Sequence, residues 1–142
     1  LLVSVGAMAA IAVEAAGMAY REGVGVTVID PRWVKPLPVS LATIAQRYKS
    51  VVVLEDGIKH GGIASSISEM FRESGLATPI HSIGIPLEFI EHSKRAEIMN
   101  DLGITAQSIA RSIVEWNSLL SGSTMAEMQY PAHESADRKQ RS

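Results

Sequence analysis

No cysteine occurs among the 142 residues of this sequence. Its absence excludes disulfide bonds, thiolate metal sites and thiol nucleophiles together. A chain without cysteine also fits a reducing compartment, so we expect a cytoplasmic location.

Excess positive charge is absent as well, because the formal net charge is −2. No basic field is therefore available to hold nucleic acid or an anionic membrane. The dense basic run at 138–141 is expected to belong to a solvated tail. No stretch reaches the roughly 18 apolar residues of a membrane span. The apolar start, 1–16, lacks a basic flank and contains Glu14, which argues against a signal peptide.

The sequence does contain a regular alternation of short β-prone runs with longer helical stretches. The predicted strands are 1–5, 24–30, 51–55 and 79–85, and the predicted helices are 7–21, 38–48, 63–73, 94–102 and 106–120. Such alternation predicts a three-layer α/β/α fold with a mainly parallel sheet of about four to five strands. We expect residues 1–120 to form one domain and residues 121–142 to form a mostly disordered tail.

Local signals set several of these boundaries. Gly23, Gly75 and Gly103 are expected to end helices, and Ser93 and Thr105 are expected to cap the last two. The first helix should be largely buried, because alanine, methionine and isoleucine leave it little polar face. It should lie on one face of the sheet, with the later helices on the other. The chain opens on a buried strand without methionine, so we expect it to be part of a longer polypeptide.

Ligands of such sheets meet the carboxyl ends of the strands, at the point where the strand order reverses. The candidate positions are 6–7, 30–32, 55–57 and 84–86. The neighbouring carboxylates Glu55 and Asp56 point to opposite faces of a strand, so they are not expected to act as one acid–base couple. Asp56 is expected to cap the following turn instead.

Gly61 and Gly62 open a helix whose free N–H groups could receive a phosphate or a carboxylate. The pair equally permits a tight turn with close packing, and without a complete phosphate-loop pattern we favour packing. The histidines, at positions 60, 81, 92 and 133, have no metal-ligand spacing, and the serines at 65, 66 and 68 form no nucleophile elbow. We therefore predict no catalytic, cofactor-binding or metal-binding residue in this segment.

A proline-pinned loop, 31–38, carries the aromatic Trp33 between two cations. Residues that precede proline are held out of the α region, so the loop is expected to be extended. Its two positive charges would suit an anion, but a rigid loop with one aromatic is typical of packing, and we favour an interdomain or dimer contact. The candidate interface or cleft residues are Arg32, Trp33, Lys35, Asp56, Gly61 and Gly62.

Four stretches follow one another in a fixed order. They read DPRWVKP at 30–36, VLEDG at 53–57, GGIAS at 61–65 and GIPLEFI at 84–90. Together they resemble the C-terminal domain shared by transketolases, the β subunits of 2-oxo-acid dehydrogenases and the 1-deoxy-D-xylulose-5-phosphate synthases. The later stretches HSKRAE at 92–97 and LGITA at 102–106 are similar to the synthases in particular.

The resemblance implies a longer parent enzyme, a transferase that depends on thiamine diphosphate and Mg²⁺ held by upstream domains. A synthase of this type condenses pyruvate with D-glyceraldehyde 3-phosphate, releases CO₂ and feeds isoprenoid, thiamine and pyridoxal synthesis. This segment would be inactive alone, would bind no cofactor, and would pack against the upstream domains and within a homodimer. The resemblance further implies that the first and third strands are neighbours, and that another edge strand precedes Leu1.

Three alternatives stay open. The parent could be a transketolase or a 2-oxo-acid dehydrogenase β subunit. The chain could be a free-standing module that binds a phosphorylated ligand at Gly61 and Gly62. It could also be a protein-interaction domain that uses Trp33 and the proline loop as its contact surface.

Overall fold

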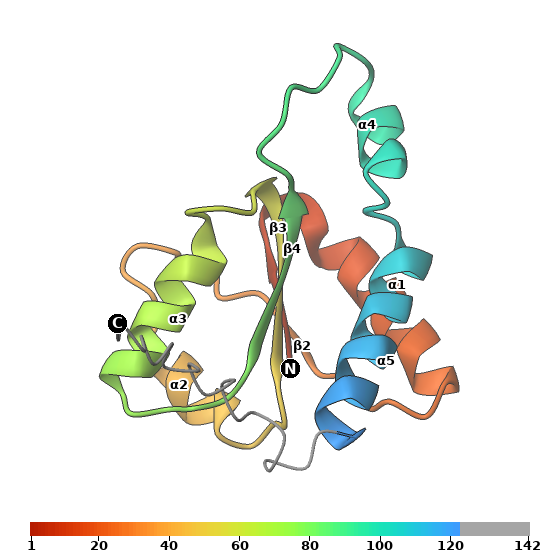
Figure 1. The fold of residues 1–142 in the computed structure, drawn as a ribbon. Coiled ribbons are helices and arrows are strands. Elements are labelled where there is room, and N and C mark those ends of the chain that lie inside the picture. The colour runs from red at the N-terminus through yellow and green to blue at the C-terminus, as the bar shows by residue number, and fades with distance from the viewer. Residues whose placement is uncertain (123–142) are drawn as a thin grey trace, which may run out of the picture.

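The computed structural model describes residues 1–122 and confirms the alternation of strands and helices (Figure 1). The elements are β1 (Leu2–Val5), the short 3₁₀ helix η1 (Gly6–Met8), α1 (Ala9–Arg21), β2 (Val28–Ile29), α2 (Ser40–Ala45), β3 (Val51–Ile58), α3 (Ile63–Glu73), β4 (Ile80–Ile85), α4 (Arg95–Asp101) and α5 (Ala106–Gly122). The predicted tail lies outside the described residues from position 123 on. Within residues 1–122, no helix combines the length and the hydropathy that crossing a membrane requires.

The sheet has the order β2-β1-β3-β4, and every neighbouring pair of strands is parallel. β1 and β3 form its centre, with Leu2 opposite Val52 and Val3 opposite Val53. Both faces of these strands are covered, which explains why their sequences are continuous apolar runs. The strand order reverses between β1 and β3, so the predicted α/β fold and the neighbourhood of the first and third strands are both confirmed.

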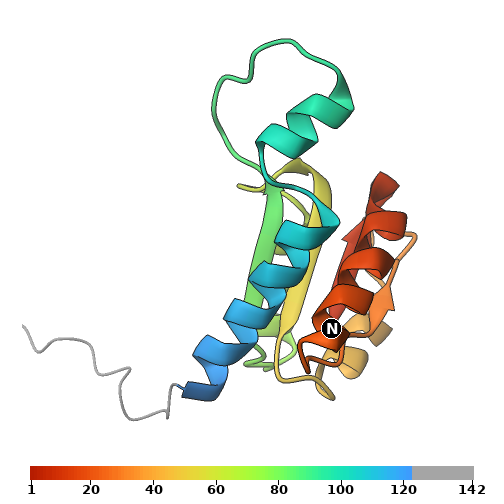
Figure 2. The same cartoon turned by 90° about the vertical axis from the view of Figure 1, so that its right-hand side faces the viewer.

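Helices cover both faces of the sheet, α1 and α5 on one side and α2 and α3 on the other (Figures 1 and 2). This arrangement creates two separate apolar cores. The core beneath α1 and α5 includes Leu2, Val52, Leu54, Ile109 and Ile113. The core beneath α2 and α3 includes Val3, Leu41, Val53, Ile67 and Phe71.

α1 and α5 pack against each other because α1 presents a row of alanines. Ala12, Ala15 and Ala19 are fully buried, and their spacing of three and four residues places them on one side of the helix. Such small side chains allow the apolar stripe of α5, which includes Ile113, to come close. Two predictions were therefore wrong. α5 shares the face of α1, and α1 is buried on one side only, since Val13 is 62% exposed.

Two strand boundaries differ from the prediction because of pairing. β2 has 2 residues instead of the predicted 24–30, and it pairs with β1 only through Leu2 and Val3. β3 continues to Ile58 rather than ending at residue 55, because Ile58 still pairs with Ile85 of β4 beyond an irregularity in the register. This longer β3 places Asp56 within the strand.

The helix ends largely follow the predicted signals. The three glycines expected to end helices all have positive φ, the conformation that such a stop uses. The N–H of Ser108 donates to Oγ1 of Thr105 at 3.2 Å, so the cap of α5 is confirmed. At α4 the cap position belongs to Lys94 rather than to Ser93, whose hydroxyl donates instead to the carboxylate of Glu97.

Candidate functional site

All four strands end at the same edge of the sheet, because they are parallel. The loops that follow β2, β3 and β4 therefore leave from this carboxyl edge, which is the upper side of the sheet in Figure 1. The strand order reverses here between β1 and β3, so this is where a sheet of this type meets its ligands. The predicted candidate positions all lie at this edge.

Glu55 lies in β3 and is buried, with 7% of its surface exposed. Its Oε2 accepts a hydrogen bond from the backbone N–H of Ile63, the first residue of α3, at 3.0 Å. The carboxylate thus occupies the start of α3, where free N–H groups and the helix dipole favour negative charge. We call this arrangement of Glu55, Gly62 and Ile63 the Glu55 seat.

Glycines make room for the Glu55 seat. A Cβ atom on Gly62 would overlap both carboxylate oxygens of Glu55 as well as the carbonyl oxygen of Ile58. A Cβ atom on Gly84 of β4 would lie 3.1 Å from Cγ of Glu55 and 3.0 Å from the carbonyl oxygen of Gly57. Such separations are too short for an unstrained side chain, so the carboxylate fits only because these positions lack one.

The seat bears directly on the possibility of a phosphate at Gly61 and Gly62. A carboxylate of the chain itself already receives the N–H of the first helical residue, and its negative charge opposes a second anion at the same helix end. This geometry favours the interpretation of the two glycines as a tight turn with close packing. Sequence reasoning missed the partner of α3, although a glutamate at a strand end shortly before a glycine pair and a helix is the available signal.

Asp56 has a different partner from the predicted one. It does not cap the following turn; its Oδ2 accepts hydrogen bonds from Nη2 of Arg95 at 2.7 Å and from Nε of the same residue at 3.3 Å. The same Nη2 lies 3.8 Å from the sulfur of Met8 in η1. Arg95 is the first residue of α4, so its side chain joins the ends of β3 and β1 across the reversal point. The pairing lies 39 positions apart in sequence, which is why local patterns did not reveal it.

The loop after β2 holds Arg32, Trp33 and Lys35, apart from the Glu55 seat. The N–H of Arg32 donates to Oδ1 of Asp30 at 2.8 Å, and Arg32 itself has a φ of 61°. This tight turn presents Trp33 outward, with 72% of its surface exposed. The structure thus separates the predicted residues into three places: the exposed loop, the Asp56–Arg95 pair on one face of β3, and the two glycines next to Glu55 at the start of α3.

His81 is the one histidine for which the structure provides a packed environment among the described residues. Its Nε2 lies 3.1 Å from Oγ of Ser112, and its ring stacks on Trp116 of α5 with centroids 5.1 Å apart. Burial, followed by the nearby charge of Lys59, lowers the pKa of His81 below its ordinary value. The side chain starts near the amino end of β4, so it belongs to the packing of α5 and not to the carboxyl edge.

The described histidines and carboxylates do not gather. Across residues 1–122, no group of three histidine, aspartate or glutamate side chains is arranged to hold a metal ion. His133, the last candidate from the sequence, lies outside the described residues.

Comparisons with known proteins match most of the chain to one family of domains. Residues 1–109 match the family model described as "Transketolase, C-terminal domain". The chain is 43% identical over 122 residues to 1-deoxy-D-xylulose-5-phosphate synthase 2 of Streptomyces avermitilis. This alignment covers 86% of the chain and 19% of that protein. It is 45% identical over 116 residues to the 1-deoxy-D-xylulose-5-phosphate synthase of Rhodococcus jostii, covering 82% of this chain and 18% of that protein.

A solved structure agrees with these matches. It is described as "Split gene transketolase, inactive beta4 tetramer" and superposes with a TM-score of 0.75 at 27% sequence identity. The superposition covers 83% of this chain and 39% of the solved chain. The present chain thus spans less than a quarter of the two synthases above, 19% and 18% of their lengths, and less than half of the solved protein.

Proposed function

Because the chain belongs to the transketolase C-terminal domain family, we propose that it is the C-terminal domain of a 1-deoxy-D-xylulose-5-phosphate synthase. The observation that carries this proposal is the 43% and 45% identity to two such synthases over more than four fifths of the chain. Transketolase and 2-oxo-acid dehydrogenase β subunits are less well supported, since the two synthases are 43% and 45% identical to the chain and the solved transketolase is 27% identical.

The parent enzyme is proposed to condense pyruvate with D-glyceraldehyde 3-phosphate and to release CO₂. Thiamine diphosphate supplies the carbanion chemistry of such a reaction when it is bound. Mg²⁺ prefers several oxygen ligands, and across residues 1–122 no group of three histidine, aspartate or glutamate side chains is arranged to hold a metal ion. We therefore assign thiamine diphosphate and Mg²⁺ to the upstream domains and derive no step through them here.

The segment itself is proposed to be inactive and to serve in packing. Two contacts at the carboxyl edge support this role, because Glu55 is bonded to the start of α3 and Asp56 to Arg95. The described likeness to an inactive β4 tetramer is consistent with it. Its partners would be the upstream domains and a second parent subunit, with Trp33, Arg32 and Lys35 in the contact surface. A cytoplasmic location fits the absence of cysteine.

Two measurements test the proposed function. The longer parent polypeptide should convert pyruvate and D-glyceraldehyde 3-phosphate to CO₂ and 1-deoxy-D-xylulose 5-phosphate when thiamine diphosphate and Mg²⁺ are supplied, as followed by NMR. The 142-residue chain should give no heat of binding with thiamine diphosphate in calorimetry. Micromolar affinity of the chain alone, or ketol transfer between sugar phosphates by the parent without use of pyruvate, would contradict the proposal.

A further inference from the structure

The exposed apolar side chains include an unusual pair on one loop. Among the described large apolar residues Phe89 is the most exposed, at 94%, and Leu87 is 72% exposed. Both lie in residues 86–94, which join β4 to α4 and are called the arm loop from here on. Figures 1 and 2 show this segment and α4 projecting beyond the carboxyl edge of the sheet. Clustered apolar side chains in water mark a contact surface.

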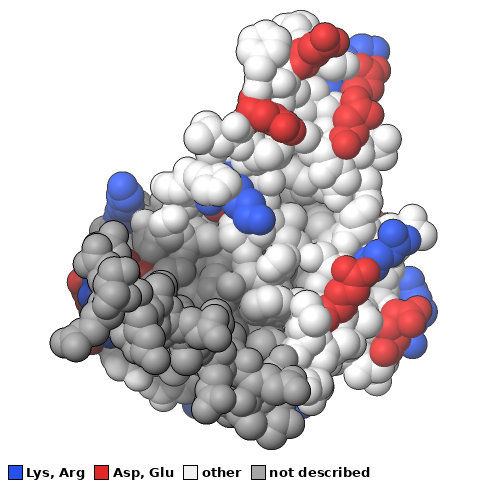
Figure 3. Space-filling view, in the orientation of Figure 1, with Lys and Arg blue, Asp and Glu red and all other residues white. Residues whose placement is uncertain are grey.

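The tip of the arm loop carries negative charge. Glu88 and Glu91 flank Phe89, and residues 86–91 contain no lysine or arginine. Figure 3 shows acidic side chains gathered on this projection. The tip is thus apolar with a negative rim, and its complement is an apolar pocket with a rim of lysine or arginine.

The arm loop is anchored at both of its ends. At one end β4 pairs with β3 as far as Ile85. At the other end Arg95 is bonded to Asp56, and Met99 of α4 is buried in the core beneath α1 and α5. A tip held in this way loses less conformational freedom when it docks than a loop anchored at one end would.

On the premise of the proposed function, we propose that the arm loop docks into the upstream part of the parent polypeptide. Phe89 is its anchor, and the partner surface is an apolar pocket rimmed by lysine or arginine. The lengths of the relatives support this occupant, because the matched region is only 19% of one synthase and 18% of another. A partner in the same polypeptide also meets the loop at high effective concentration.

In a second copy of this domain, the groove between α1 and α5 is a poor match for the tip. The groove between α1 and α5 has an apolar floor that includes Met18 and Val114. Its rim, however, alternates cations with anions and is not basic. The charged residues of that rim are Arg21, Glu22, Arg111 and Glu115. The negative rim of the arm loop would therefore meet anions as well as cations there, so this groove is not the basic-rimmed complement of the tip.

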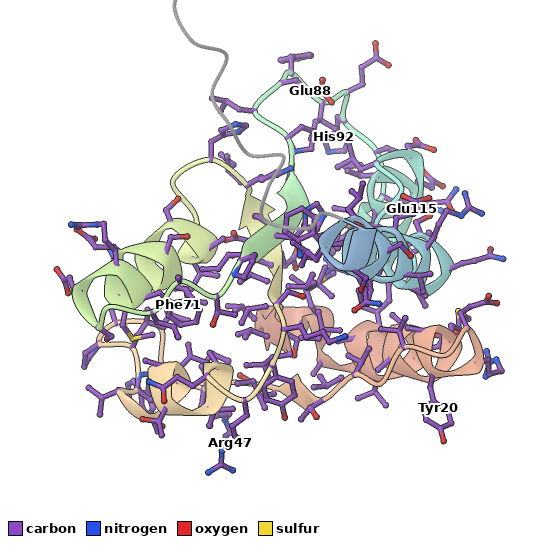
Figure 4. The ribbon with its side chains drawn as sticks, turned by 60° about the horizontal axis from the view of Figure 1, so that its bottom comes forward. Tyr20, Arg47, Phe71, Glu88, His92 and Glu115 are labelled. Carbon is purple, nitrogen blue, oxygen red and sulfur yellow. The ribbon has the colours of Figure 1, made fainter. Side chains whose placement is uncertain are left out.

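Amide hydrogen exchange on the 142-residue chain and on the longer parent tests this inference. Exchange at residues 86–92 should be about tenfold slower or more in the parent, because the docked loop must open before its amides exchange. Phe89→Ala in the parent should remove most of that slowing. Tyr20→Ala is the matched control, since Tyr20 is also an exposed aromatic but lies far from Glu88 and His92 of the arm loop (Figure 4). It should leave the slowing intact.

Three results would overturn the docking inference. The exchange rates of residues 86–92 could be equal in the chain and the parent, or Phe89→Ala could leave the slowing unchanged. The slowing could also appear in the 142-residue chain and grow with its concentration, which would identify a second copy as the occupant. The synthase assay keeps the two proposals apart. Slowing without synthase activity would refute only the proposed function, and activity without slowing would refute only the docking.

Discussion

At the carboxyl edge of the sheet, the Glu55 carboxylate is buried against the start of α3, whereas Phe89 of the arm loop is held out in solvent. In the Glu55 seat the carboxylate accepts a hydrogen bond from the backbone N–H of Ile63, and Gly62 leaves space for it because it has no side chain. The arm loop leaves its apolar tip without a partner among the described residues. An anion at the start of α3 would have to displace the bond between Glu55 and Ile63, while a contact at the arm would displace only water.

The Glu55 seat is stabilised by contacts within the chain, whereas the tip of the arm loop leaves an apolar side chain available to a partner. Substitutions in the Glu55 seat should change the stability of the chain by itself. Substitutions at the arm tip should leave that stability within about 0.5 kcal/mol, as surface changes usually do. The following predictions test the contrast, in order of decreasing expected effect.

Gly62→Ala is expected to have the largest effect. The added methyl group would overlap the Glu55 carboxylate and the Ile58 carbonyl oxygen, and overpacking of this kind typically costs about 1–3 kcal/mol, to which weakening of the Ile63 hydrogen bond would add. Urea unfolding of the 142-residue chain measures the loss. Gly61→Ala is the matched control: nothing lies within 4 Å of its added Cβ, so only its φ of +74° opposes the change, at about 1 kcal/mol. Equal losses would contradict the steric account of the seat.

Glu55→Ala should be the next largest change. It leaves the N–H of Ile63 at the buried start of α3 without its acceptor, and an unsatisfied buried donor costs about 1–3 kcal/mol. Glu69→Ala is the control, because Glu69 is an exposed glutamate on the same helix whose ion pair with Arg72 spans 3.9 Å. It should cost less than about 0.5 kcal/mol. Similar urea midpoints for the two variants would show that the buried carboxylate of Glu55 contributes no more to stability than the exposed carboxylate of Glu69.

Arg95→Gln should have a smaller effect, since the arginine side chain is 58% exposed. An exposed ion pair contributes at most about 1 kcal/mol, and added salt weakens it further. A double-mutant cycle with Asp56→Asn isolates the coupling between the two side chains. Because the pair joins the arm to β3, the cycle also asks whether the arm is anchored to the sheet as firmly as the geometry indicates. A coupling free energy of zero at low salt would show that it is not.

The parts of this picture that depend on local pattern could be predicted from the sequence. The apolar runs 1–5 and 51–55 gave the two central strands, because a strand buried on both faces needs no alternation. Thr105 marked the start of α5, because a cap acts within one helical turn.

What could not be predicted depends on pairs that are distant in sequence. Nothing near Asp56 in the chain indicates Arg95, and nothing near α5 indicates the alanine row of α1 that it covers. Glu55 was correctly separated from Asp56 by strand geometry, but its acceptance of the Ile63 N–H depends on how α3 approaches β3. The family resemblance supplied the order of strands; the contacts at the carboxyl edge required the structure.

The smallest expected effect concerns pH and contrasts a packed histidine with one on the arm. Burial against Trp116 and Ser112, together with the charge of Lys59, lowers the pKa of His81 in the folded chain. The unfolded chain therefore binds a proton more readily, and the free energy of unfolding should fall as pH drops below about 6.5, the ordinary value, towards the lowered folded pKa. Urea unfolding above and below this value measures the slope.

His81→Asn should flatten that slope, and His92→Asn serves as the control because the His92 side chain is exposed in the folded chain. Comparing variants is necessary because the amino group of Leu1, whose pKa burial lowers to about 6, titrates in the same range. The Leu1 contribution is common to all three proteins, so the difference in slope belongs to the histidines. If His92→Asn flattened the profile and His81→Asn did not, the arm loop would be packed in the isolated chain. The contrast between the buried Glu55 carboxylate and the solvent-exposed arm loop would then be wrong.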